Sequence, residues 1–253
     1  MTISRWGEAA DLGARGRYFD AWRILDRLEH EPAPLPSLAA SMRASHLRQI
    51  GEIEAALRHD ERALACASEE QSSADARIGL AADAVAAGRP SDAHAPLAQG
   101  ESDALKNWRT STRWHWVSAE LALAEGRPED AIDHARRALS ACEGLSDRHA
   151  AKSRVIAEAA RGASGRSGLG ADLLAAAAVA RVSHLATLQW PIALVAADLT
   201  ASGAVTRELV AEGPRLHREG AAAVRTIAEG LPESLRGAWL RGPAAARLLG
   251  DGE

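Results

Sequence analysis

Residues 119–139 read AELALAEGRPEDAIDHARRAL, and they decide the fold of this chain. An amphipathic helical run precedes Gly126, and a second one follows it. A glycine between two such runs suits a left-handed turn, a conformation that costs alanine about 1 kcal/mol and glycine almost nothing. Pro128 and the two acids behind it suit the first turn of the second helix. The stretch predicts two antiparallel helices joined by a tight turn.

The same pattern occurs four times. Glycines at positions 16, 51, 88 and 126 each follow an amphipathic run, and successive glycines are 35, 37 and 38 residues apart. One alanine stands five residues after each glycine and another stands seven residues before it. These alanines are Ala21, Ala56, Ala93 and Ala131 after the glycines, and Ala9, Ala44, Ala81 and Ala119 before them. Small residues let paired helices approach closely, since larger ones would overpack the crossing by about 1–3 kcal/mol. Because one hairpin cannot bury its own apolar face, we expect neighbouring hairpins to stack into a solenoid.

The composition agrees with helices. The residues AVILMFWYC make up 47% of the 253 residues and charged residues 25%, which is typical of a globular protein. Aromatic residues are only 4%, so alanine, the strongest helix former, supplies much of the apolar content. A β-rich fold is therefore excluded.

These repeats resemble tetratricopeptide (TPR) repeats. The resemblance rests on the period, the turn glycine, the alanine five residues later, and the pairs Ala63-Leu64 and Ala138-Leu139. It covers residues 2–144. The resemblance implies an all-α, TPR-like α-solenoid of about five to six helical hairpins with a C-terminal helical cap.

The second half of the chain follows the repeat less closely. A fifth unit is aligned on Gly162 and a sixth on Gly203. We expect residues 1–212 to form the array and residues 213–253 to form a cap packed on it, within a single continuous domain. Prolines divide the cap into three expected helices: Pro214–Glu229, Pro232–Arg241 and Ala244–Leu249. The end of the chain also resembles TPR sensor regions of large bacterial ATPase-type transcription regulators.

The sequence contains no recognisable catalytic constellation. It has no glycine-rich phosphate loop, no His-Glu-x-x-His zinc pattern and no Gly-x-Ser-x-Gly elbow. The nine histidines are scattered singly. We therefore expect a protein that is not an enzyme, with no catalytic residues, no metal site and no cofactor.

Charge and cysteine content favour a cytoplasmic protein. The formal net charge is −4, which disfavours a dedicated nucleic-acid binder. The N-terminus lacks the pattern of a secretion signal, and polar residues interrupt the most apolar stretch, residues 169–202. Cys66 and Cys142 each end an alanine-rich helical run, so we expect small, buried, reduced thiols.

The TPR resemblance also implies which residues line a groove. In TPR arrays the first helix of each hairpin faces the concave side through positions thirteen, ten, six and three before the turn glycine. The candidates of most interest at these positions are Trp6, Arg48, Ile78, Arg113, Trp116, Glu120 and, in the sixth unit, Trp190. Trp114 and Trp116 lie about 200° apart on a helix, so we expect one in the core and the other available for binding.

The favoured function is a non-catalytic protein-interaction module or adaptor. Its partner would be a protein or peptide, bound as an amphipathic helix or extended segment in an apolar, Trp-containing concave groove. Such a groove favours apolar partners over an acidic tail, and the Lys, Arg and Asn pattern of carboxylate-clamping TPR proteins is absent. Two alternatives remain: a nucleic-acid-binding α-solenoid that uses Arg and Trp, and an orphan regulatory sensor region that binds an effector or oligomerises. The oligomeric state stays open.

Overall fold

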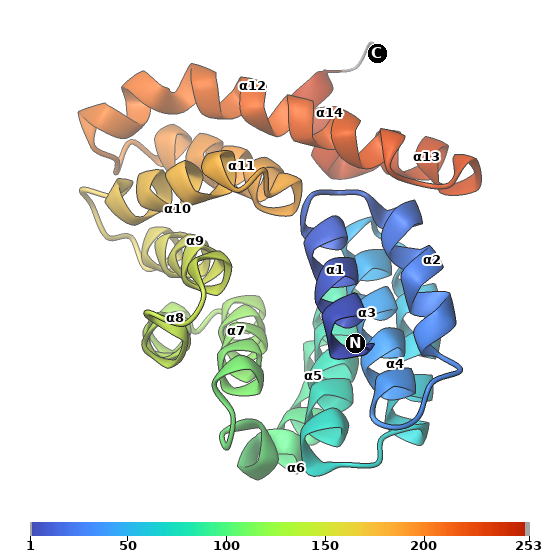
Figure 1. Cartoon of the computed structure of the whole chain (residues 1–253). Coiled ribbons are helices and arrows are strands. Elements are labelled where there is room, and N and C mark those ends of the chain that lie inside the picture. The colour runs from blue at the N-terminus through green and yellow to red at the C-terminus, as the bar shows by residue number, and fades with distance from the viewer. Residues whose placement is uncertain (1, 251–253) are drawn as a thin grey trace.

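The computed structural model describes residues 2–250, and its helices pair into antiparallel hairpins that follow one another around a ring (Figure 1). The hairpins are α1 (Thr2–Ala14) with α2 (Tyr18–Leu28), α3 (Leu35–Gln49) with α4 (Ile53–Ala65), α5 (Glu70–Ala86) with α6 (His94–Ala104), α7 (Trp108–Ala124) with α8 (Pro128–Cys142), α9 (Asp147–Ala163) with α10 (Ala171–Val182), and α11 (Ala186–Ser202) with α12 (Arg207–Glu229). The short 3-10 helix η1 (Pro90–Ala93) precedes α6, while α13 (Glu233–Leu240) and α14 (Pro243–Leu249) come last. The predicted all-α solenoid is confirmed.

The two alanine columns lie where the helices of a hairpin meet. All eight alanines of the repeat are 0% exposed. Their burial explains the pattern physically, because a side chain beyond Cβ at these places would separate the paired helices.

The turns between paired helices share one geometry. Gly16, Gly51, Gly88 and Gly126 have φ between +71° and +86°, and the residue after each donates its N–H to a carbonyl five residues earlier, as Arg127 does to Ala122 at 2.8 Å. This is the hydrogen bond of a Schellman C-cap. The connection between the fifth and sixth hairpins, from α10 to α11, has the same geometry: His184 lies there at φ +53°, and the Leu185 N–H donates to the Ala180 carbonyl.

The fifth turn differs from the prediction. Its left-handed glycine is Gly165, where Arg166 donates to the Arg161 carbonyl, and Gly162 lies inside α9. A Cβ on Gly162 would lie 2.3 Å from Leu199 Cδ2, so this glycine serves the close approach of α11. Gly203 ends α11 in the left-handed conformation, as expected of a turn glycine.

The expected boundary between array and cap falls inside α12. This helix begins at Arg207, after Thr206 accepts a hydrogen bond from the Leu209 N–H, and it continues through Pro214 to Glu229. It is the second helix of the sixth hairpin, because it packs along α11. Only α13 and α14 remain outside the hairpins of the described chain, and their bounds agree with the predicted ones to within two residues.

The last helices close the array onto its first hairpin. One core cluster contains Tyr18 and Leu25 of α2 together with Val224 and Ile227 of α12. The Phe19 N–H donates to the Gly230 carbonyl at 2.7 Å. Figure 1 shows α12 and α13 lying across the end of α2. The chain is therefore closed into a ring, and the cap bridges its two ends.

The apolar stretch 169–202 forms the helices α10 and α11. Their apolar side chains form a buried cluster with residues of α9 and α12, including Leu173, Ile192 and Leu209. Within residues 2–250, no helix has both the length and the apolarity needed to span a membrane.

The two cysteines occupy different environments. Cys142 is buried, as expected, and its thiol donates weakly to the Leu139 carbonyl. Cys66 is exposed at the end of α4. The expectation of two buried thiols was therefore wrong for Cys66. The difference arises because Cys142 faces α9 and lies near Ser153, whereas Cys66 is already past the last turn of its helix.

Candidate ligand cavity

A cavity of about 470 Å³ lies inside the ring, and we call it the central cavity. Every residue that lines it belongs to α1, α3, α5, α7, α9 or α11, which are the first helices of the six hairpins. Its volume lies in the range of ligand pockets, about 300–1000 Å³. The arrangement follows from the repeat, because stacking equivalent helices side by side turns one face of each toward the same axis.

Six of the seven residues singled out from the sequence line this cavity. They are Trp6, Arg48, Arg113, Trp116, Glu120 and Trp190. Ile78 does not: it is 1% exposed and packs in the cluster that α5 forms with α6 and α7. Asp75 and Ala82 of α5 face the cavity instead, and Ile78 sits at the edge of that face, where the neighbouring hairpin covers it.

Trp116 is held firmly in the cavity wall. Its indole N–H donates to Ser153 Oγ at 2.8 Å, its ring stacks on His149, and the Lys152 ammonium lies 4.5 Å from its ring centroid. Trp114, which donates to the Leu97 carbonyl, is equally buried, and each tryptophan is 9% exposed. Trp114 thus lies in the core and Trp116 in the cavity wall, where α9 covers most of its ring.

Several polar atoms of the wall lack a partner among the described residues. The indole N–H groups of Trp6 and Trp190 are buried without a hydrogen-bond acceptor, and so is Ser41 Oγ, whose residue is 3% exposed. The Arg109 guanidinium lies over the Trp6 ring at 5.2 Å. Buried polar groups are normally hydrogen-bonded. These three atoms belong to residues that line the cavity, but the atoms themselves are buried within the wall and are not exposed to a ligand.

Arg48 is neutralised by two buried acids. Its guanidinium contacts Asp60 at 2.5 Å and Asp83 at 2.6 Å, and both carboxylates are almost completely buried. Gly79 makes room for Asp60, since a Cβ there would lie 2.3 Å from the carboxylate. Burial raises the pKa of Asp60 well above its ordinary value, although Arg48 opposes this shift. Arg48 thus links α3, α4 and α5, and the two aspartates already neutralise its charge.

Arg109 and Arg113 of α7 share the carboxylate of Asp75. Arg109 pairs with it at 2.7 Å, and Arg113 pairs with its other oxygen. Burial lowers the pKa of each guanidinium to about 10, which leaves both charged at neutral pH. Two cations on one carboxylate leave this part of the wall positive.

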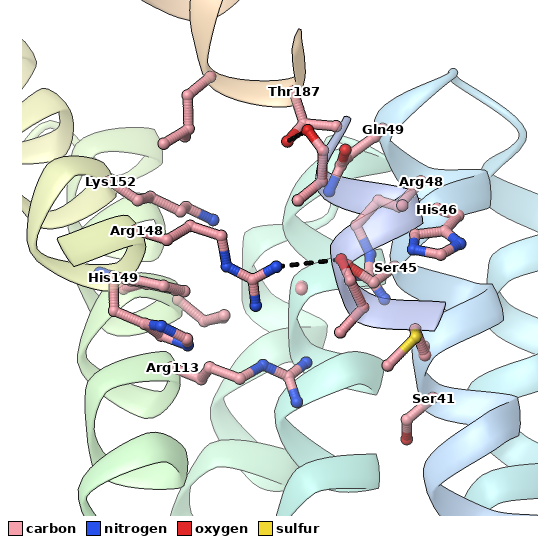
Figure 2. A pocket seen from close by; sticks show the side chains of 18 of the residues that line it. Ser41, Ser45, His46, Arg48, Gln49, Arg113, Arg148, His149, Lys152 and Thr187 are labelled. Atoms are coloured by element: carbon pink, nitrogen blue, oxygen red, sulfur yellow. Dashed lines mark hydrogen bonds between the residues drawn. The ribbon is translucent and has the colours of Figure 1, made fainter. Parts of the chain in front are cut away.

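Arg148 and Lys152 of α9 complete the cationic wall. Lys152 lies 3.5 Å from Glu120, whereas Arg148 donates to the backbone carbonyl of Ala10, at 3.2 Å. Among the described residues no carboxylate forms an ion pair with Arg148. Figure 2 shows Arg148, His149 and Lys152 reaching from one side toward Ser45 and its neighbours on the facing side.

Sequence reasoning missed these two residues because it did not carry the concave-face rule into the fifth unit. Counting thirteen residues back from Gly165, or ten from Gly162, reaches Lys152 in either case. Arg148 lies one helical turn before Lys152 on the same face of α9.

Two histidines line the cavity, and the pKa of each is lowered. The pKa of His149 is lowered to about 3 by burial and then by Arg148, Arg109, Arg113 and Lys152. Burial, with Arg148 and Arg43, also lowers the pKa of His46 to about 3. Both imidazoles are therefore neutral at pH 7. The wall is more cationic than the apolar groove expected from the sequence.

The metal-binding residue types do not gather in this cavity. Over residues 2–250 there is no group of three or more His, Cys, Asp or Glu side chains that could hold a metal ion. What the wall offers is a set of hydrogen-bond donors and positive charges between aromatic rings.

Comparison with known proteins extends the description of the fold. A solved structure of a Rap protein in complex with competence and sporulation factor matches this chain with a TM-score of 0.61. The likeness is one of fold. Sequence identity is 13%, and the match covers 94% of this chain but 66% of that one, just under two thirds of its length. No family model matches the chain, and no curated protein does. The chain thus has a TPR-like helical-repeat fold.

Proposed function

We propose that this chain is a non-catalytic binding module that holds a short, extended segment of a protein or peptide in the central cavity. The observation that carries this proposal is that the first helices of all six hairpins contribute side chains to one cavity. Trp6, Trp116 and Trp190 would contribute aromatic surface there, and tryptophan is among the residue types most often found as binding hot spots.

The shape of the cavity supports an extended segment rather than an amphipathic helix. Arg148 of α9 reaches the Ala10 carbonyl of α1, so a side chain bridges two walls. A helix with its side chains is about 10–12 Å wide, so a cavity of about 470 Å³ would hold only about one turn of it. The structural neighbour, a Rap protein in complex with competence and sporulation factor, supports a binding role for this fold.

Nucleic-acid binding receives less support. Arg48, Arg109 and Arg113 form ion pairs with buried aspartates, and their side chains are only 15–19% exposed. A phosphate backbone needs accessible cations along a surface, and the net charge of −4 opposes such binding.

Site-specific photo-cross-linking tests the proposal. Ser45, which lines the cavity, is replaced by benzoylphenylalanine in the full chain, and Arg136, which is 72% exposed on the outside of α8, is replaced in the control. Irradiation in the cells that make the protein, followed by mass spectrometry, should give peptide adducts at position 45 that are absent at position 136. Equal adducts at both positions, or none at position 45, would contradict binding in the cavity.

A further inference from the structure

One cation of the central cavity has no acidic partner within residues 2–250. Arg148 is partly buried, and its guanidinium donates to the neutral carbonyl oxygen of Ala10. Asp11 acts on it electrostatically without forming an ion pair. Each of the other lining cations contacts a carboxylate: Arg48 pairs with two aspartates and Lys152 with Glu120, while Arg109 and Arg113 share Asp75. Removing a charge from water is costly unless an opposite charge and hydrogen bonds compensate it, and no carboxylate of the described chain is in contact with Arg148.

The wall around Arg148 offers donors rather than acceptors. Arg109, Arg113 and Lys152 line the same cavity and carry N–H donors. Gln49 accepts a hydrogen bond from the Tyr18 hydroxyl at 2.7 Å through Oε1, which leaves its amide N–H groups as donors at the cavity. A ligand that complements this wall must therefore be rich in acceptors and carry negative charge.

We propose that the central cavity recognises a carboxylate of the bound segment, with Arg148 as its main ligand and Lys152 beside it. The inference rests on the proposed function and names the chemistry of its occupant. A carboxylate would supply the ion-pair partner that Arg148 lacks among the described residues.

Arg148 would bind a ligand carboxylate more strongly than it binds the Ala10 carbonyl. A carboxylate adds the attraction of an opposite charge to the hydrogen bond with a guanidinium, and the pair is often bidentate. The Ala10 carbonyl is a single neutral acceptor, so a carboxylate that took its place would leave no charged group without a partner. The acidic partner that the sequence disfavoured is therefore the one that the assembled cavity favours.

Selection from random peptide libraries tests this inference. The full-length protein is used to select from two heptapeptide libraries, one with a free C-terminal carboxylate and one amidated. We expect enrichment of Asp or Glu in the amidated library if the carboxylate is a side chain, and enrichment only in the free library if it is the C-terminus. Enrichment of neutral apolar peptides from both would overturn carboxylate recognition while leaving the proposed function intact. If neither library is enriched and no cross-link forms at position 45, both carboxylate recognition and the proposed function are contradicted.

A double-mutant cycle then assigns the contact to Arg148. The selected peptide and its Gln-substituted or amidated counterpart are titrated against wild type, Arg148→Gln and, as the control, Arg136→Gln. We expect Arg148→Gln to weaken the acidic peptide about tenfold or more and to leave the neutral peptide nearly unchanged. Arg136→Gln should match wild type.

The same titrations separate this assignment from its alternatives. If Arg148 only bridged α9 to α1, Arg148→Gln would weaken both peptides equally, which would overturn the assignment. A single-stranded oligonucleotide that bound more tightly than any selected peptide would overturn it in favour of phosphate. Melting curves for each variant exclude unfolding as the cause of lost affinity.

Discussion

Arg48 lies between two buried carboxylates, and the stability of the N-terminal half depends on that position. Replacing it by methionine leaves Asp60 and Asp83 buried without their cation. We expect Arg48→Met to lower the free energy of unfolding at pH 7 by about 3–5 kcal/mol, as measured by urea denaturation. Arg136→Met removes an exposed pair with Asp133 and should change stability little.

The pH dependence of this loss follows from the same two acids. Burial raises the pKa of Asp60 and of Asp83 above their ordinary values, so the folded state holds these protons more tightly than the unfolded chain does. Their contribution to stability is then greatest at low pH and is lost as the pH rises through the raised pKa. Removing Arg48 raises both pKa values further. The difference between Arg48→Met and wild type should therefore shrink from pH 7 to pH 5, and a constant difference would contradict this account.

At the scale of the element, a single left-handed residue ends the first helix of each hairpin. A Cβ on Gly126 would meet no atom within 4 Å, so Gly126→Ala tests the backbone alone. We expect it to lower the free energy of unfolding by about 1 kcal/mol, because alanine disfavours φ near +71°. His184→Gly should raise it by up to about 1 kcal/mol, since His184 occupies the left-handed region in the connection between α10 and α11.

A glycine inside a helix, Gly7, provides the control for these two substitutions. It lies inside α1, and a Cβ at this position would have open space around it, so Gly7→Ala should raise stability by about 0.5–1 kcal/mol. Equal effects of alanine at positions 7 and 126, measured by urea denaturation, would show that the turn geometry is not what selects glycine.

At the scale of the whole molecule, the ring is closed by a backbone contact. A Cβ on Gly230 would lie 2.0 Å from the Gly16 carbonyl oxygen, although Gly230 itself has an ordinary φ of −78°. We expect Gly230→Ala to separate α12 from the first hairpin, lowering the free energy of unfolding by about 1–3 kcal/mol and increasing the radius of gyration in small-angle scattering. Gly213→Ala, in the same helix but with nothing near its Cβ, should leave the radius unchanged. An unchanged radius for Gly230→Ala would mean that this contact does not hold the ends of the array together.

The sequence by itself determined the helical hairpins and much of the concave face. The turn glycines and alanine columns are local features, since each acts between helices that follow one another in the chain. The same register placed Trp6, Trp116 and Trp190 correctly on the cavity side. It failed at Ile78, where a neighbouring hairpin covers the edge of α5. The position of a residue on its own helix does not reveal what packs beside it.

Only the tertiary structure decided that the array closes and that its interior is cationic. The Arg148 contact to Ala10 joins residues 138 apart in the chain, and the Thr187 hydroxyl reaches the Ala14 carbonyl across 173 residues. Such contacts depend on the sum of small rotations over six stacked hairpins, which no single repeat encodes. The arginine–aspartate pairs form within a hairpin or between neighbouring hairpins, whereas the closure brings Arg148 of α9 against a neutral carbonyl of α1. The partner's chemistry is therefore set by the ring as a whole.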